Sequence, residues 1–225
     1  RADQPPATQS EMVTLFVTLH DKEGQLIDNV PKEQIRVFDD GKEQIVTLFA
    51  QENPQSLSIG FLMQGSGMRR EELPYAEVGP ADVFFRSFLG SSDAVFVARF
   101  ADKPIALTDF VQDPAMIGTA LQTATETELY GPRALLDSIS WASREKLLTR
   151  TGHRVLIVTS DAEDNASRAS LDQAVQAALQ TNTSIYFVTL PLTPDMPDFV
   201  RTRNRRLAAQ ISRRTGGHST FAADQ

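Results

Sequence analysis

Acidic residues follow an apolar segment of strand character in the second half of the chain, and they are the first candidates for chemistry. Asp161, Glu163 and Asp164 come directly after the apolar run 154–160. Carboxylates grouped in this way could hold a hard cation through their oxygens. The alternative is helix capping: Asn165 or Ser167 can cap the following helix, and acidic residues near its start suit the helix dipole. Capping explains Asp161 least well, since this residue lies at the strand end itself.

A tight turn follows an earlier apolar segment, where residues 57–63 lead into the sequence MQGSGM at residues 63–68. Ligands bind at such strand ends in open α/β sheets, yet this turn has no carboxylate. Ser66, with Asp161 and His218 later in the chain, has the order of a hydrolase triad, but the glycine expected two residues before the serine is missing. We therefore expect no enzyme, and serine hydrolysis through Ser66 is the weaker alternative.

The composition is that of a globular protein with an acidic excess. Of 225 residues, 41% are hydrophobic and 23% charged, which excludes wholesale disorder, and the formal net charge is −7. A nucleic-acid surface needs a basic face, so we expect no nucleic-acid partner. The absence of cysteine excludes disulfides, thiolate metal sites and a cysteine nucleophile. No apolar run approaches the length of a membrane span, so we expect no membrane insertion of this segment.

The two ends of the chain have distinctive compositions. Residues 1–10 are polar and contain prolines, which predicts a disordered lead-in. Such a start is typical of an exported protein after processing, or of a trimmed chain; the first alternative predicts a secreted, periplasmic or cell-envelope location. Near the C-terminus, a predicted helix is rich in arginine, and a solvated helix face explains this better than a phosphate-binding patch. The arginines are Arg201, Arg203, Arg205, Arg206, Arg213 and Arg214.

The elements that must position these residues fall into two parts. Residues 11–53 predict a small β-rich unit that packs on the main domain. Its expected elements are strands at 13–19, 35–38 and 45–49 and one helical turn at 31–34. Residues 54–225 alternate strands with helices, which predicts an α/β domain with a doubly wound, mostly parallel, Rossmann-like sheet covered by helices on both faces. The expected strands are 57–63, 94–100, 105–107, 154–160, 184–190 and 219–221, and the expected helices 81–89, 113–123, 133–148, 167–181 and 204–215.

Several short segments, taken in order and at their spacings, resemble the von Willebrand factor A-type domain, in particular its bacterial group. The resemblance runs from about residue 13 to residue 221. The matching segments are residues 17–24 and 35–41 and the runs SDAVFVARF (92–100), ALLDSI (134–139), SDAEDN (160–165) and TGG (215–217). Each motif is weak alone, and their order makes the resemblance specific.

This resemblance implies a divalent cation at a metal-ion-dependent adhesion site, held by an Asp-x-Ser-x-Ser turn, a threonine and an aspartate. Carried over to this chain, the turn's aspartate falls on Met63 and its serines on Gly65 and Gly67. The threonine falls on Arg133, and the last aspartate survives as Asp161. A hard dication needs several anionic oxygens, and a guanidinium in its place repels it. We therefore expect no metal and no cofactor.

Arg133 suggests what replaces the cation. Its guanidinium could pair with Asp161 and hydrogen-bond to Ser66 or Gln64; the alternative is that it points to solvent. The resemblance then implies a non-catalytic, adhesion-type module that binds a protein partner. The candidate contacts at the degenerate site are Arg133 for an anion, the pair Glu163-Asp164, and Met63 or Met68 as an apolar contact. A structural subunit of a cell-envelope assembly is the alternative function.

Overall fold

The main domain is built on a mixed sheet of six strands in the order β5-β4-β3-β6-β7-β8. The computed structural model describes residues 13, 15, 17, 19, 21–22, 27, 29–50, 56–66, 77–127, 129–190 and 196–221. Five of the six strands are parallel, and β5 pairs with β4 in the antiparallel direction at the edge. This confirms the predicted α/β architecture. The strands are β3 (Leu57–Gln64), β4 (Ala94–Phe100), β5 (Pro104–Ala106), β6 (His153–Ser160), β7 (Thr183–Thr189) and β8 (Ser219–Phe221).

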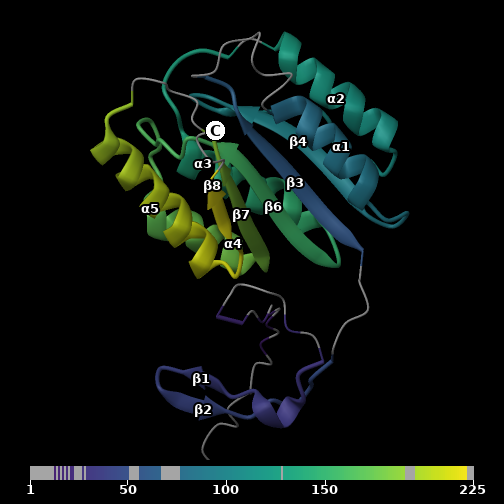
Figure 1. Ribbon diagram of the computed structural model, residues 1–225, viewed down its shortest axis with the longest axis vertical. Helices are drawn as coiled ribbons and strands as arrows, with labels where there is room; N and C mark the ends of the chain where they lie inside the picture. The colour runs from purple at the N-terminus through teal and green to yellow at the C-terminus, as the bar shows by residue number, and fades with distance from the viewer. Residues whose placement is uncertain are drawn as a thin grey trace, which may run out of the picture.

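Helices cover both faces of this sheet (Figure 1). One apolar core joins the odd-numbered residues of β3 to α1 and α2. The other core joins its even-numbered residue Leu62 to α3, α4 and α5. The helices are α1 (Gly79–Phe88), α2 (Pro114–Glu126), α3 (Leu135–Trp141), α4 (Leu171–Gln180) and α5 (Asp198–Arg214); α3 continues as the π-helical turn η3 (Ala142–Lys146) and the 3₁₀ turn η4 (Leu147–Thr149).

The central strands are apolar on both faces because helices lie on both sides of them. Every residue of β4 is buried. Gly60 in β3 leaves room for an aromatic ring, since a Cβ at this position would lie 2.6 Å from Cε1 of Phe96. Phe96 in turn packs edge-on against Trp141, with ring centroids 6.1 Å apart. Trp141 is therefore a packing residue of the α3 side.

The N-terminal part contains a short antiparallel hairpin of β1 (Val37–Asp39) and β2 (Lys42–Gln44). The helical turn expected at 31–34 is present as η1 (Lys32–Gln34). The strand expected at 45–49 is wrong: Asp40 and Gly41, with φ of 46° and 76°, form a two-residue turn, so the second strand starts at residue 42.

The packing of the N-terminal unit on the main domain stays a prediction. None of the described residues between 13 and 50 is buried, and Ile45 is 90% exposed. The strand expected at 13–19 is described at alternate residues, none of which is in a strand. Residues 1–10 lie outside the described part of the chain.

A capping box starts α4, and it gives a first testable prediction. The Ser170 hydroxyl accepts from the Gln173 backbone N–H at 3.3 Å, and the Gln173 side chain accepts from the Ser170 N–H at 2.8 Å. Ser170→Ala removes the first of these bonds and should lower the free energy of unfolding by about 1 kcal/mol. Urea unfolding measures this, and Ser170→Asp, which retains a capping oxygen, is the matched control. Equal losses in both variants would contradict the capping role.

Candidate functional site

The candidate site lies where β3 and β6 end side by side. Gln64 is the last residue of β3 and is 1% exposed. The Ser160 hydroxyl donates to Gln64 Oε1 at 2.5 Å, and Gln64 Nε2 donates to the Ser66 carbonyl at 2.7 Å. Ser160 Oγ also accepts from the Ala162 N–H at 2.9 Å. One glutamine therefore joins the turn after β3 to the loop after β6.

Met63 is not part of this site, contrary to the prediction. Its side chain is 0% exposed and packs in the core against α1 and α2. Successive side chains of a strand point to opposite faces, so it is Gln64 that meets Ser160. The Asp-x-Ser-x-Ser pattern of the resemblance then begins at Gln64, which keeps Ser66 as its first serine and places Met68 at the second. Gly67 and Met68 lie outside the described residues.

Gly65 allows the loop before α3 to approach the turn closely. A Cβ at this position would lie 2.6 Å from the Leu129 side chain. The Gly65 N–H donates to the Phe100 carbonyl at 2.6 Å, which holds the turn against the end of β4. Among the described residues, the buried Ser66 hydroxyl beside it has no hydrogen-bond partner. The turn is thus held by the Gly65 backbone bond and by the Gln64 side chain.

Arg133 lies between two carboxylates of the acidic loop. Its Nη1 forms a short ion pair with Glu163, and its Nη2 lies 3.7 Å from Asp161 Oδ2. The three side chains are 13%, 22% and 4% exposed for Arg133, Glu163 and Asp161. The structure thus has the expected pairing with Asp161, and Glu163 is the closer partner, which the sequence did not indicate. The alternative, an Arg133 side chain pointing to solvent, is wrong.

The remaining residues of the acidic loop hold α3 rather than α4. Asp164 Oδ1 accepts from the Leu136 N–H at 3.3 Å and from the Ser167 hydroxyl at 2.5 Å. Asn165 Oδ1 accepts from the Arg133 N–H at 2.7 Å. The expected capping of the following helix by Asn165 or Ser167 is wrong, because Ser170 caps α4. The loop folds back over the start of α3, where Ser167 Oγ accepts from the Asp137 N–H at 3.1 Å. Asp161 accepts from the Glu163 N–H at 3.0 Å, within the loop itself.

A buried polar cluster behind the turn was missed by the sequence reasoning. Arg99 of β4 donates to the carbonyls of Ala124 at 2.6 Å and of Gly65 at 3.0 Å, and also to Thr127. The Thr159 hydroxyl donates to Glu77 Oε1 in a short bond. Arg99 and Glu77 are 5% and 3% exposed. The available signal was an arginine within an otherwise apolar strand.

Burial sets the protonation behaviour of this cluster. It raises the pKa of Glu77 to about 7, against the opposing effects of the Thr159 hydroxyl and the Arg99 charge. Burial likewise lowers the pKa of Arg99, and the Glu77 carboxylate opposes that shift. Glu77 Oε2 and Arg99 Nε have no hydrogen-bond partner among the residues that the structure describes. The carboxyl group of Glu77 therefore titrates near neutral pH directly behind the candidate site.

The residues named for a hydrolase triad do not come together. Ser66 follows β3, whereas His218 precedes β8, three strands away in the sheet order β3-β6-β7-β8. At about 4.8 Å per strand this separates them by roughly 14 Å. The His218 carbonyl accepts from the Phe187 N–H at 2.9 Å, which fixes it beside the middle of β7. A Ser66–His218 hydrogen bond is therefore excluded.

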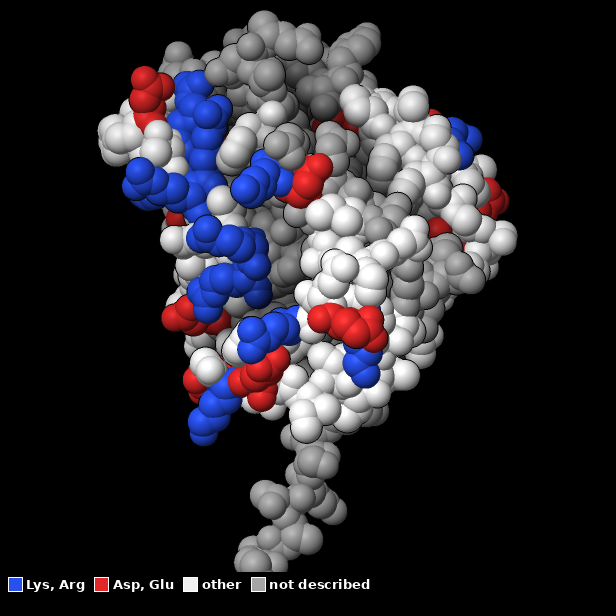
Figure 2. All heavy atoms as spheres, turned by 60° about the horizontal axis from the view of Figure 1, so that its bottom comes forward, with Lys and Arg blue, Asp and Glu red and all other residues white. Residues whose placement is uncertain are grey.

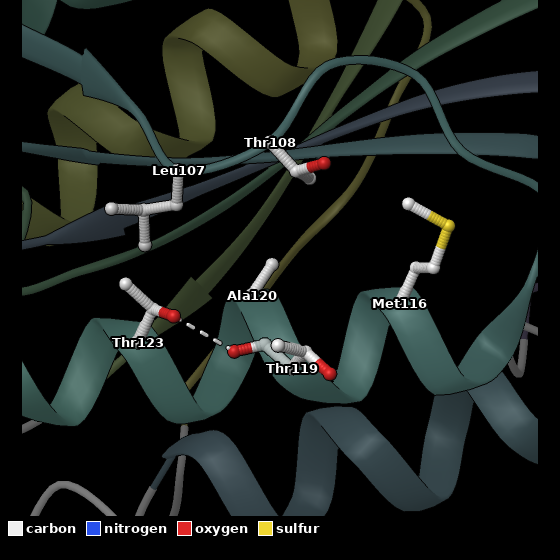
Figure 3. A pocket seen from close by; sticks show the side chains of 6 residues that line it. All are labelled: Leu107, Thr108, Met116, Thr119, Ala120 and Thr123. Atoms are coloured by element: carbon white, nitrogen blue, oxygen red, sulfur yellow. Dashed lines mark hydrogen bonds between the residues drawn. The ribbon is translucent and has the colours of Figure 1, made fainter.

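Three further observations concern metal sites, pockets and membrane spans among the described residues. They contain no group of three or more His, Asp or Glu that could hold a metal ion. A hollow beside α2, lined by Leu107, Thr108, Met116, Thr119, Ala120 and Thr123, carries no charge (Figure 3). Its Thr119 and Thr123 hydroxyls both donate to carbonyls one turn back in the helix, at 3.0 Å. No helix in the described part of the chain combines the length and apolar character of a membrane span.

The sheet order, the antiparallel edge strand and the two helical layers define the fold of von Willebrand factor A domains. Solved structures match it with probability 1.00: a von Willebrand factor type A protein from Catenulispora acidiphila, at TM-score 0.58 and 13% identity, covers 76% of this chain and 39% of its own. BatB from Bacteroides thetaiotaomicron matches at TM-score 0.56 and 14% identity, covering 76% and 92%. Proximal thread matrix protein 1 from the mussel byssus, with a zinc-occupied MIDAS motif, matches at TM-score 0.61 and 15% identity. The match covers 76% of this chain and 42% of that protein.

These likenesses establish the fold. The chain spans less than half the length of the first of these structures. No protein-family model and no curated protein matches the chain.

Proposed function

We propose that this chain is a non-catalytic, adhesion-type module that binds a protein partner at the carboxyl edge of its sheet without a metal ion. One observation carries the proposal: the Arg133 guanidinium lies between Asp161 and Glu163 and places a positive charge beside both carboxylates. The fold supports the protein-binding part, since the neighbouring structures include a von Willebrand factor type A protein and a byssus matrix protein.

The residues at this edge do not suit the cation that the family pattern implies. With the pattern begun at Gln64, an amide replaces the first carboxylate, and Met68 and Arg133 replace a serine and the threonine. Ser66 and Asp161 remain, which supplies one anionic ligand where a hard dication needs several. The Gln64 amide is bonded on both its oxygen and its nitrogen. The guanidinium of Arg133 would also repel a cation beside it by several kcal/mol at an effective dielectric of about 20.

Tyr130 supplies the kind of contact that a metal-free edge needs. It lies in the loop that leads into Arg133 and is 77% exposed. Pro132, two residues further along the chain, is also exposed. Asn165 is exposed too, and its side chain accepts from the Arg133 N–H, which holds the two loops together. Exposed tyrosines often account for much of the binding energy of an interface, because a large ring becomes buried with little loss of side-chain entropy. We infer that Tyr130 is the central contact, flanked by the acidic loop.

We further propose a cell-envelope or extracellular location for this module. The support is indirect: one neighbouring structure is an aerotolerance-related membrane protein from Bacteroides fragilis, and another is the byssus matrix protein.

Affinity capture from native extract, performed in a chelator, tests the proposal. The wild-type chain should retain its partner when divalent cations are removed. Tyr130→Ala should reduce the retained partner at least tenfold, as expected for a loss of about 1.4 kcal/mol or more. Phe88→Ala, on α1 and 55% exposed, is the matched control for loss of an exposed aromatic ring. Capture that requires a divalent cation, or that is insensitive to Tyr130→Ala, contradicts the proposal; a permanent stoichiometric complex favours the structural-subunit alternative.

A further inference from the structure

Helix α5 presents a row of arginines on the side turned away from the core. The helix contains six arginines and, apart from Asp198 in its first turn, no acidic residue. Figure 2 shows lysine and arginine side chains gathered along the edge of the molecule that carries this helix. Its opposite side is the buried one, formed by Asn204, Ala208, Ile211 and Ser212.

Three of these arginines form no ion pair in the part of the chain that the structure describes. Arg203, Arg206 and Arg213 are exposed and lie at helical spacings of three and seven residues, so they share one face. No ion pair involves them within the described residues; Arg203 donates long bonds of 3.4 Å to Asn204. We call these three residues the arginine row. About 15 Å separate its ends at 1.5 Å per residue.

The other arginines of α5 are already engaged. Arg214 forms an ion pair with Asp172 at 2.8 Å, and Arg205 stacks over the Phe221 ring at 5.0 Å. Arg201 donates to the Met196 carbonyl at 3.1 Å. The contrast makes the row distinct, because the chain has 29 acidic residues and a net charge of −7, yet no carboxylate among the described residues pairs with these three cations.

We propose that the arginine row binds an acidic segment of a partner protein, at a surface separate from the carboxyl edge of the sheet. Guanidinium groups bind carboxylates through two parallel hydrogen bonds, and the row holds arginine at every position. Alternate side chains of an extended peptide lie about 7 Å apart, so a short acidic segment reaches from one end of the row to the other. Phe199, on the same face and 76% exposed, supplies an apolar contact beyond the first arginine.

The surroundings of the row favour a peptide over nucleic acid or an anionic membrane. Asp198 and Asp172, 100% and 79% exposed, lie at the beginning of α5 and beside its end. A broad polyanion would extend past the row and meet these carboxylates and the acidic remainder of the chain. A narrow acidic peptide contacts the row alone, and its attraction weakens with added salt.

Fluorescence anisotropy with labelled octaglutamate tests this proposal. The wild-type chain should bind the peptide at low ionic strength. The dissociation constant of the variant Arg203→Gln/Arg206→Gln/Arg213→Gln should be at least about tenfold higher. The matched control is Lys103→Gln/Arg144→Gln/Arg168→Gln, which removes the same charge from exposed positions elsewhere. The control should stay within about twofold of the wild type. Circular dichroism verifies that each variant keeps its helices.

Several outcomes would overturn the proposal. One is a wild-type chain that does not bind octaglutamate at low salt. Another is equal weakening in both variants, which indicates an effect of net charge alone. A third is tighter binding to duplex DNA or to phosphatidylserine vesicles than to the peptide, which would assign the row to nucleic acid or membrane. Tyr130→Ala should leave octaglutamate binding unchanged, so this result is separate from the test of the sheet edge.

Discussion

The variant Gln64→Asp/Met68→Ser/Arg133→Thr should bind a divalent cation, whereas the wild-type chain should not. The three changes restore two oxygen ligands and a carboxylate beside Ser66 and Asp161, and they remove the positive charge of Arg133. Magnesium or manganese at about one hundred times its dissociation constant should stabilise the variant by about 2.7 kcal/mol. Thermal unfolding with and without the metal, at matched ionic strength, measures this gain.

Two controls make this experiment decisive. Adding Asp161→Asn to the variant should abolish the metal effect, since Asp161 is the surviving anionic ligand of the pattern. The single variant Arg133→Thr leaves Asp161 and Glu163 without their cation, and it should be less stable than the wild type in the absence of metal. If metal stabilises the wild-type chain as strongly as the variant, the proposed metal-free edge is wrong.

The variant Glu77→Gln should be more stable than the wild type at alkaline pH and equally stable at acidic pH. The pKa of Glu77 is raised to about 7 in the folded chain, above the ordinary value of 4.5. The folded state therefore holds its proton more tightly than the unfolded state does. The wild type loses stability as pH rises from about 4.5 to about 7, and the loss is complete above that range, reaching about 3 kcal/mol.

Urea unfolding at about pH 5 and about pH 8 measures the difference. Glutamine keeps an oxygen that accepts from Thr159, so the variant isolates the charge of Glu77. Glu43→Gln is the comparison: Arg36 lowers the pKa of Glu43, so this variant should lose stability, relative to the wild type, as pH rises through the acidic range. A stability difference between Glu77→Gln and the wild type that does not change with pH would falsify the assignment.

The sequence predicted the sheet because its strands are long apolar runs separated by helical periodicity. The central strands and the acidic loop lie where this pattern placed them. The convergence of the ends of β3 and β6 with the start of α3 at one edge of the sheet also followed from this pattern. The Arg133–Asp161 pairing was expected from the resemblance to von Willebrand factor A-type domains, which places Arg133 at the position of the metal-binding threonine.

Other features depended on information that no local pattern contains. The pairing of β3 with β6 decides which face of the sheet the Met63 and Gln64 side chains point to. An error of one residue in the predicted register therefore places Met63 in the site and Gln64 in the core. Glu77 and Thr159 are 82 residues apart in sequence and meet through packing of α1 on the sheet. The hairpin strands shifted because Asp40 adopts a positive φ of 46°, which non-glycine residues seldom do.

Arg99 has a structural consequence for the carboxyl edge of the sheet. One guanidinium group holds the carbonyl of Gly65, in the turn after β3, together with the carbonyls of Ala124 and Thr127 at the end of α2. This one side chain therefore couples the position of the turn to the end of α2, and a displacement of either would strain the same set of hydrogen bonds.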